Sequence, residues 1–273
     1  MPKYQVIISD SLNACTELAT NSVDLVLTSP PYPSINREYG IWHPEDWLGY
    51  MSQLMHQLRR VVKPTGSAVI VIEPNSERVG QRHDWPYRFV LNSMHSWNLV
   101  QDAYWIKLSC MPSGGATRHG LMRTATEWCL WFGEPDCYRN QKQVLWEYSP
   151  THMQRVAQRA HMSGAGTKRP SGHVEWKKEC KDNGGSTPMN WLPCSPASYD
   201  GHPACYPQRL CDYWIKYLSP PSGVVLDPFS GSGTTGVSAL QNGRTYIGVE
   251  RDKSYAEKSI SRLHKIQQAN RYL

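Results

Sequence analysis

A glycine-rich turn near the carboxyl end of the chain has the residue types and spacing of a nucleotide site. The turn, residues 231–236 (GSGTTG), follows the apolar run 224–227 and precedes a helical pattern. Glycine lets the backbone approach a ligand closely, and the first N–H groups of a helix point at the same place. Glu250 ends the next apolar run, where its carboxylate can accept hydrogen bonds from both hydroxyls of a ribose.

The ligand expected at this turn is a nucleoside, although the glycine pattern alone also admits a dinucleotide. Asp227 stands at the start of the turn. A carboxylate there suits a positively charged amino group better than it suits a pyrophosphate. The residue types therefore favour a nucleoside that carries a cationic substituent.

A second candidate site, Ser29-Pro30-Pro31-Tyr32, directly follows the buried apolar run 23–28. The Ser29 hydroxyl and the Pro30 carbonyl can accept hydrogen bonds from an exocyclic amino group, and Tyr32 can stack on the ring that carries it. The alternative is a rigid proline turn with a buried tyrosine. Because open α/β sheets bind ligands beyond the carboxyl ends of their strands, the position of the motif favours a site.

Strands and helices alternate on both sides of the polar middle of the chain, which predicts an α/β fold with a doubly wound, mostly parallel sheet. The predicted strands are 4–9, 23–28, 67–72, 100–107, 126–132, 224–227 and 245–250. The predicted helices are 11–20, 46–62, 84–96, 207–218, 234–242 and 254–268. Both candidate sites then lie where a strand ends.

The composition of the 273 residues limits the class of protein. With 40% hydrophobic and 19% charged residues the chain is too apolar to be disordered, and no apolar run reaches the length of a membrane span. Eight cysteines without a CxxC pair argue against a zinc site, and the absence of a signal-peptide pattern predicts a cytoplasmic location. The net charge of +6 permits a polyanionic partner without requiring one.

Residues 134–200 are polar, rich in Gly, Pro and Ser, and poorly periodic, and residues 141–199 within them are interpreted as an insert. Within 151–182 there are seven basic residues and three acidic ones. Charge alone leaves open whether this stretch is a solvated insert or a face that binds nucleic acid.

Together the motifs resemble S-adenosylmethionine-dependent DNA amino-methyltransferases, and their order resembles the permuted β group of that family. The main signatures are residues 28–32 (TSPPY) and 227–235 (DPFSGSGTT). The smaller ones are 9–12, where Ser9 replaces the usual Gly, 63–66 (KPTG), where Thr65 replaces Gly, 202–204 (HPA) and 247–250 (IGVE). The resemblance covers about residues 1–133 and 200–273.

The resemblance implies a Rossmann-like class I methyltransferase fold that is circularly permuted. Residues 1–140 and 200–273 would form the catalytic and cofactor-binding domain, and residues 141–199 the target-recognition insert. Strand 4–9 would then follow the final helix in space, so the termini would lie close together.

The resemblance also assigns roles to residues. The catalytic residues would be Ser29, Pro30, Pro31 and Tyr32. The cofactor would contact Asp10, Asp227, Phe229, Gly231, Ser232, Gly233, Thr234 and Glu250, with Asp10 at the adenine unless it acts only as a helix cap. The DNA would contact Arg118, Arg123, Lys168, Arg169, Lys177 and Lys178.

The activity implied is transfer of a methyl group from S-adenosylmethionine to N4 of a cytosine flipped out of double-stranded DNA. Ser29 after Thr28 favours cytosine N4 over the alternative, adenine N6. An RNA amino-methyltransferase is less favoured because the motif order is reversed and the Asn of NPPY is absent; an inactive DNA-binding module is less favoured because both motifs are intact. No metal is expected, and the chain is expected to be a monomer or a weak homodimer. The resemblance also allows a partner, a restriction endonuclease that cuts the same DNA site.

Overall fold

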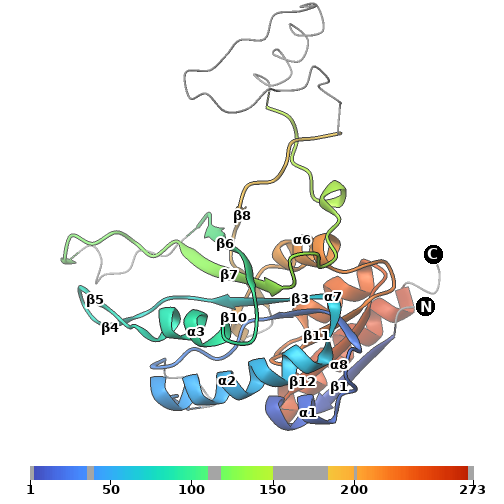
Figure 1. Cartoon of the computed structure of the whole chain (residues 1–273), viewed down its shortest axis with the longest axis horizontal. Coiled ribbons are helices and arrows are strands. Elements are labelled where there is room, and N and C mark those ends of the chain that lie inside the picture. Colours follow the sequence, from blue (N-terminus) through green and yellow to red (C-terminus); the bar gives the residue numbers. More distant parts are fainter. Residues whose placement is uncertain (1–2, 36–39, 110–117, 150–183, 200–201, 270–273) are drawn as a thin grey trace, which may run out of the picture. The chain divides into compact units, whose positions relative to one another are not determined.

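An eight-stranded sheet organises the computed structural model, which describes residues 3–35, 40–109, 118–149, 184–199 and 202–269 (Figure 1). From edge to edge its strands are β1 (Tyr4–Ile8), β12 (Thr245–Glu250), β11 (Val224–Asp227), β2 (Val23–Thr28), β3 (Val62–Ile72), β7 (Thr126–Gly133), β6 (Leu99–Lys107) and β8 (Trp191–Cys194). Within the described residues the helices are α1 (Ser11–Glu17), α2 (Pro44–Val61), α3 (Trp85–Ser93), α6 (Gln208–Leu218), α7 (Thr234–Gln241) and α8 (Lys253–Ala269), with a 3₁₀ turn, η1, at Gln141–Gln143.

The strand directions confirm the predicted, mostly parallel sheet. Neighbouring strands from β1 to β3 are parallel, and β8 is parallel to β6. Strand β7 runs antiparallel to both of its neighbours, β3 and β6. The carboxyl ends of β1, β12, β11, β2 and β3 therefore meet at one edge of the sheet, where the two candidate loops begin.

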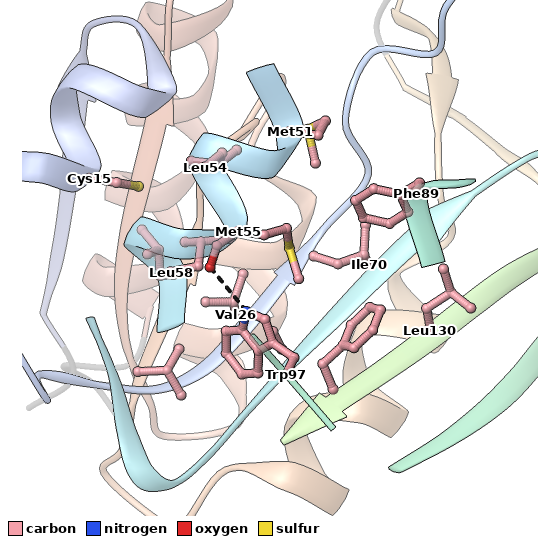
Figure 2. Packing of buried hydrophobic residues seen from close by; sticks show 14 of the residues in the cluster. Cys15, Val26, Met51, Leu54, Met55, Leu58, Ile70, Phe89, Trp97 and Leu130 are labelled. Atoms are coloured by element: carbon pink, nitrogen blue, oxygen red, sulfur yellow. Dashed lines mark hydrogen bonds between the residues drawn. The ribbon is translucent and has the colours of Figure 1, made fainter. Parts of the chain in front are cut away.

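Both faces of the sheet are buried, as expected for strands that read as continuous apolar runs. Along β3, Ala68, Ile70 and Ile72 pack in the core under α1, α2 and α3. Val69 and Val71, which alternate with them, pack in the core that α6, α7 and α8 cover. Figure 2 shows the first of these cores, in which α2 lies against strands β2, β3 and β7.

Helix α2 begins at Pro44, two residues before its predicted start. Proline is favoured in the first turn because its missing N–H has no partner there, and His43 caps the helix by accepting the Glu45 N–H. Its buried side chains recur at helical spacing, and the indole of Trp97 donates to the Met55 carbonyl at 3.0 Å (Figure 2). This bond fixes the end of α3 and its following turn against the middle of α2.

The sequence did not predict the short strands. Hairpin β4 (Ser76–Arg78) and β5 (Gln81–Arg82), strand β8, and the pair β9 (Ala197–Tyr199) and β10 (His202–Cys205) are all two to four residues long. Runs of this length are too short to show a period.

The structure confirms the predicted permutation at the edge of the sheet. Strand β1 pairs with β12 in parallel, from Tyr4 opposite Tyr246 to Ile8 opposite Glu250. The Ser9 N–H continues this ladder to the Glu250 carbonyl at 3.1 Å, and α8 packs against β1. The first strand of the chain thus follows the last helix in space.

The chain divides into two compact units, residues 1–140 with 190–273, and residues 141–189. The predicted insert, residues 141–199, includes the second unit and also contains strand β8, which pairs with β6. No helix in the described part of the chain is long and apolar enough to cross a membrane.

The KPTG segment is part of β3 and contacts the start of β2 through an ion pair and close packing. Lys63 Nζ lies 2.8 Å from both carboxylate oxygens of the buried Asp24, which also accepts the Val224 N–H. A methyl group at Gly66 would stand 2.7 Å from Val62 Cγ1 and 2.8 Å from the Asp24 carbonyl. Only glycine therefore fits where β3 passes the start of β2.

We expect Gly66→Ala to lower the free energy of unfolding by about 1–3 kcal/mol, the usual cost of overpacking. Gly49→Ala is the matched control: the site is exposed in α2 with no heavy atom within 4 Å of the new Cβ. That change should raise stability by about 0.5–1 kcal/mol, since alanine is the better helix former. Denaturant unfolding measures both, and equal effects would contradict the packing argument.

Candidate functional site

The two candidate loops start from neighbouring strands. Strands β2 and β11 pair in parallel, with Leu25 opposite Val225 and Val26 opposite Leu226. Residues 29–32 and 228–233 follow the carboxyl ends of these strands, so the loops leave the sheet side by side. The sheet thereby joins two motifs that are about 200 residues apart in the sequence.

The carboxylate of Asp227 holds the two loops together. Its Oδ1 accepts the Thr28 hydroxyl at 2.6 Å and the Phe229 N–H at 3.1 Å. Its Oδ2 accepts the Thr235 hydroxyl at 2.6 Å and the Tyr206 hydroxyl at 3.1 Å. A carboxylate has about four acceptor positions, and all of them are used here.

This geometry limits how Asp227 could contact a cofactor. The residue is only 1% exposed, and burial raises the pKa of its carboxyl, against the opposing effect of its hydrogen bonds. A cationic amino group could reach the carboxylate only by displacing one of its donors. The residue joins the cofactor-type loop to the SPPY loop.

The backbone of the SPPY loop is held by side chains from α2 and the segment before α3. The Trp47 indole donates to the Pro31 carbonyl at 2.6 Å, and Asn75 donates to the Pro33 carbonyl at 2.8 Å. The Trp85 indole donates in turn to Asn75 Oδ1 at 2.7 Å. Two prolines and these bonds fix the loop, and they leave the Ser29 side chain partly exposed.

Ser29 and Tyr32 contact each other across this loop. Ser29 Oγ lies 2.9 Å from Tyr32 Oη, which also lies 2.9 Å from Glu127 Oε2 and 3.5 Å from the Val71 carbonyl. The Tyr32 ring stacks beside Trp85, with centroids 6.5 Å apart. Trp85 therefore holds the ring of Tyr32, and hydrogen bonds hold its hydroxyl.

A charged cluster that the sequence analysis missed lies behind Tyr32. Glu127 of β7 is 7% exposed, and its Oε1 lies 2.8 Å from Lys107 Nζ at the end of β6. Lys107 also contacts Glu73 at 3.0 Å. Burial raises the pKa of Glu127, against the lowering effect of Lys107. The signal in the sequence was an acidic residue within an apolar strand, but its partners depend on strand pairing.

The glycine-rich loop has the backbone that its sequence predicts. Gly231 and Gly233 have φ angles of 51° and 80°, in the left-handed region that favours glycine. A Cβ at Gly233 would collide with Ser259 Oγ of α8. Glu250 holds the loop by accepting the Gly231 N–H and the Asp252 N–H, each at 2.8 Å. Helix α7 begins after Gly233, which makes no side-chain cap.

The other predicted cofactor residues take different positions around this loop. Thr234 is the first residue of α7 and is partly exposed, whereas Ser232 is buried and accepts hydrogen bonds from Arg262. The Phe229 side chain packs partly buried against the core beneath α1 and α2. Thr234 is thus accessible in part, whereas Ser232 contacts α8.

Asp10 lies beside the cofactor-type loop and caps α1. Its Oδ1 accepts the Leu12 and Asn13 N–H groups, and its Oδ2 accepts the Tyr50 hydroxyl at 3.0 Å. The neighbouring Ser11 hydroxyl donates to the Pro228 carbonyl. The helix-cap role is therefore confirmed, and Asp10 remains partly exposed next to the loop.

The predicted DNA-contacting residues fall in two groups. Arg118 and Arg123 precede β7 and are exposed. The predictions for Lys168, Arg169, Lys177 and Lys178 lie outside the described residues. Among the residues that are described, no group of three His, Cys, Asp or Glu side chains could hold a metal ion.

Comparisons with known proteins agree with this arrangement. Residues 23–261 match a family described as DNA methylase. The type II methyltransferase M.PvuII of Proteus hauseri is 28% identical over 276 residues, which cover 93% of this chain and 82% of that protein.

Two solved structures share the fold. PvuII DNA methyltransferase, described as cytosine-N4-specific, has a TM-score of 0.73 at 22% identity, over 98% of this chain and 91% of that one. A DNA modification methylase of Thermus thermophilus, described as putative and solved with S-adenosyl-L-methionine, has a TM-score of 0.61 at 20% identity, over 97% and 95% of the two chains.

We expect Thr28→Val, which removes one of the four donors to Asp227 at nearly constant volume, to lower the free energy of unfolding by about 1.5–3 kcal/mol. Thr16→Val is the control, because the exposed Thr16 hydroxyl donates only to Asn13 within α1. That control should change stability by less than about 0.5 kcal/mol. If chemical denaturation finds the two variants alike, Asp227 does not join the loops as described.

Proposed function

The chain belongs to the DNA methylase family, and we propose on that basis that it transfers a methyl group from S-adenosylmethionine to the exocyclic N4 amino group of a cytosine in double-stranded DNA. Its fold is that of the class I methyltransferases, with the cofactor loop placed last in the chain. The observation that carries the proposal is the Asp227 junction. It fixes a glycine loop suited to a nucleoside next to a loop suited to an amino group.

The cofactor site is supported by groups that border the glycine loop. The partly exposed carboxylate of Glu250 keeps acceptor positions beyond its two backbone donors, which suits ribose hydroxyls. Asp10 stands on the neighbouring strand end, where it would contact the adenine. When bound, S-adenosylmethionine supplies an activated methyl group on a sulfonium, so the protein has only to bind and orient it.

The catalytic loop would bind the amino group of the target base. Ser29 Oγ and the Pro30 carbonyl would accept its two N–H bonds, which directs the nitrogen lone pair towards the methyl group. The base must first flip out of the duplex, and the ring of Tyr32 is the surface against which it would stack. Pro31 contributes rigidity, because its carbonyl is already bound by Trp47.

Two considerations favour cytosine N4 over adenine N6 as the target. Ser29 after Thr28 is the form that resembles the cytosine members, and the structurally similar PvuII enzyme is described as cytosine-N4-specific. Adenine N6 is also a conjugated amino group beside a ring acceptor, so it remains the alternative. The choice depends on the size of the pocket, and only a product measurement decides it.

DNA would be held by the exposed Arg118 and Arg123 and by basic residues of the insert, Lys168, Arg169, Lys177 and Lys178. In this proposal residues 141–199 recognise the target and the remainder forms the catalytic domain. Since the relative from Proteus hauseri is a type II methyltransferase, a restriction endonuclease that cuts the same site would be the partner, and the chain would act as a monomer or weak homodimer.

We expect Ser29→Ala to remove most turnover while the affinity for S-adenosylmethionine stays nearly unchanged, because the hydroxyl acts on the amino group of the target. Single-turnover methylation of plasmid DNA and calorimetry of cofactor binding measure the two quantities. Mass spectrometry of the digested DNA should find N4-methylcytosine. A product of N6-methyladenine alone would contradict the choice of base but not the methyl transfer.

We expect reversal of both Lys168 and Arg169 to Glu to weaken DNA binding and to flatten its salt dependence by roughly one log–log unit for each lost phosphate contact. Reversal of Lys258 and Lys265, which are exposed on α8, changes the net charge equally and should leave the slope unchanged. Titrations of a DNA duplex at several salt concentrations measure the slope. If both pairs give the wild-type slope, the insert residues are not phosphate contacts.

A further inference from the structure

A chain of hydrogen bonds connects Ser29 to a buried carboxylate. Ser29 Oγ lies 2.9 Å from Tyr32 Oη, and Tyr32 Oη lies 2.9 Å from Glu127 Oε2. The other carboxylate oxygen of Glu127 contacts Lys107 Nζ at 2.8 Å. Three strands supply the members of this chain, since Ser29 and Tyr32 follow β2, Lys107 ends β6 and Glu127 lies in β7.

Counting the donors along this chain determines its direction. An ionised carboxylate can only accept, so Tyr32 must donate its one proton towards Glu127. The nearby Val71 carbonyl is also only an acceptor, which reinforces this direction. Tyr32 Oη is then free only to accept, and Ser29 must donate to it. The lone pairs of Ser29 Oγ are left for a donor outside the loop.

We propose that Glu127 is a positioning residue that makes the Ser29 hydroxyl donate its proton to Tyr32. Ser29 can then accept a hydrogen bond from the amino group to be methylated. This inference rests on the proposed function. With the chain reversed, Ser29 would point its own proton at the amino group, and two donors would face each other. Glu127 acts on the target only through Tyr32 and Ser29.

The groups around Glu127 keep the chain in the required direction. They are Lys107 from β6, Glu73 after β3, Tyr32 after β2 and Cys129 on β7 itself. Glu127 and Glu73 hold the pKa of Lys107 above its ordinary value, although burial opposes them, so Lys107 stays cationic. Burial, followed by the charge of Glu127, raises the pKa values of Tyr32 and Cys129, so both remain protonated and neutral.

The direction of the hydrogen bonds from Ser29 through Tyr32 to Glu127 depends on pH. Burial raises the pKa of Glu127 above the ordinary carboxyl value, while Lys107 opposes the increase. Once Glu127 is protonated it can donate to Tyr32, and Tyr32 can then donate to Ser29. Activity is therefore present above the Glu127 pKa and lost as the pH falls through it. This loss of rate at low pH is the acidic limb of the pH profile. If the ion pair served only stability, the methylation step would not have such an acidic limb.

The decisive variant is Glu127→Gln. Lys107 can only donate, so the carbonyl oxygen of the new amide must face it. The amide NH₂ then faces Tyr32 and reverses the chain, while the shape of the side chain is kept. We expect the single-turnover rate of DNA methylation to fall about 10- to 100-fold, the effect known for residues that orient a metal ligand through a hydrogen bond, with cofactor affinity unchanged.

Three comparisons make the test specific. The acidic limb of the wild-type pH profile should be absent in Glu127→Gln, and Glu127→Asp should restore both rate and limb in part. In a Tyr32→Phe background, which keeps the ring but breaks the chain, Glu127→Gln should have no further effect. Asp102→Asn is the matched control, since Asp102 accepts the Tyr104 hydroxyl at 2.6 Å on the exposed side of β6, and it should keep the wild-type rate and profile.

The outcomes separate this inference from the function on which it rests. If Glu127→Gln keeps the wild-type rate and pH profile while Ser29→Ala is inactive, the positioning role is overturned and the methyl transfer stands. If Ser29→Ala is fully active, the proposed catalytic loop fails as well. If Glu127→Gln does not fold, the acidic limb decides: the inference is overturned if Tyr32→Phe keeps the limb of the wild type.

Discussion

The carboxylate of Asp227 is the interaction on which the arrangement of the site depends. It ends β11, and its four donors come from the end of β2, the glycine loop, α7 and the segment before α6. A buried carboxylate is costly unless it is fully hydrogen-bonded, so these elements must remain together for the chain to stay folded. The same atoms that stabilise the sheet therefore fix the distance between the loop for the methyl donor and the loop for the acceptor.

Around this junction, one set of polar groups fixes the backbone of the SPPY loop, and a second set binds its serine hydroxyl. Trp47 and Asn75 fix its backbone, and Tyr32 and Glu127 determine what its one small hydroxyl can do. A serine hydroxyl in water can donate or accept a hydrogen bond. It becomes only an acceptor for further partners when its one proton is already donated to a neighbour. The chemistry of the loop thus depends on strands β6 and β7, which contribute no residue to the motif itself.

The sequence predicted the parts of the structure whose signals are local. Both loops and the parallel strands beside them follow from apolar runs, prolines and glycines that are close together in the chain. The position of residues 4–9 beside the last helix was implied by the resemblance to a permuted family. The hydrogen bonds of Asp227 were not predicted, because its donors include Thr28 and Tyr206, which are distant in sequence. The Glu127 cluster was missed for a similar reason, since Lys107 reaches it only through the antiparallel pairing of β6 with β7.

The order of strands at the centre of the sheet has a consequence for how the protein is made. Strands β11 and β12, from the last fifty residues, lie between β1 and β2, from the first thirty. While a ribosome synthesises the chain, β1 and β2 lack these neighbours and their edges stay unpaired. Pairings so distant in sequence form slowly, and open apolar edges attract other chains. The centre of the sheet, and with it the arrangement of the two loops, can therefore form only after residues 224–250 have been synthesised.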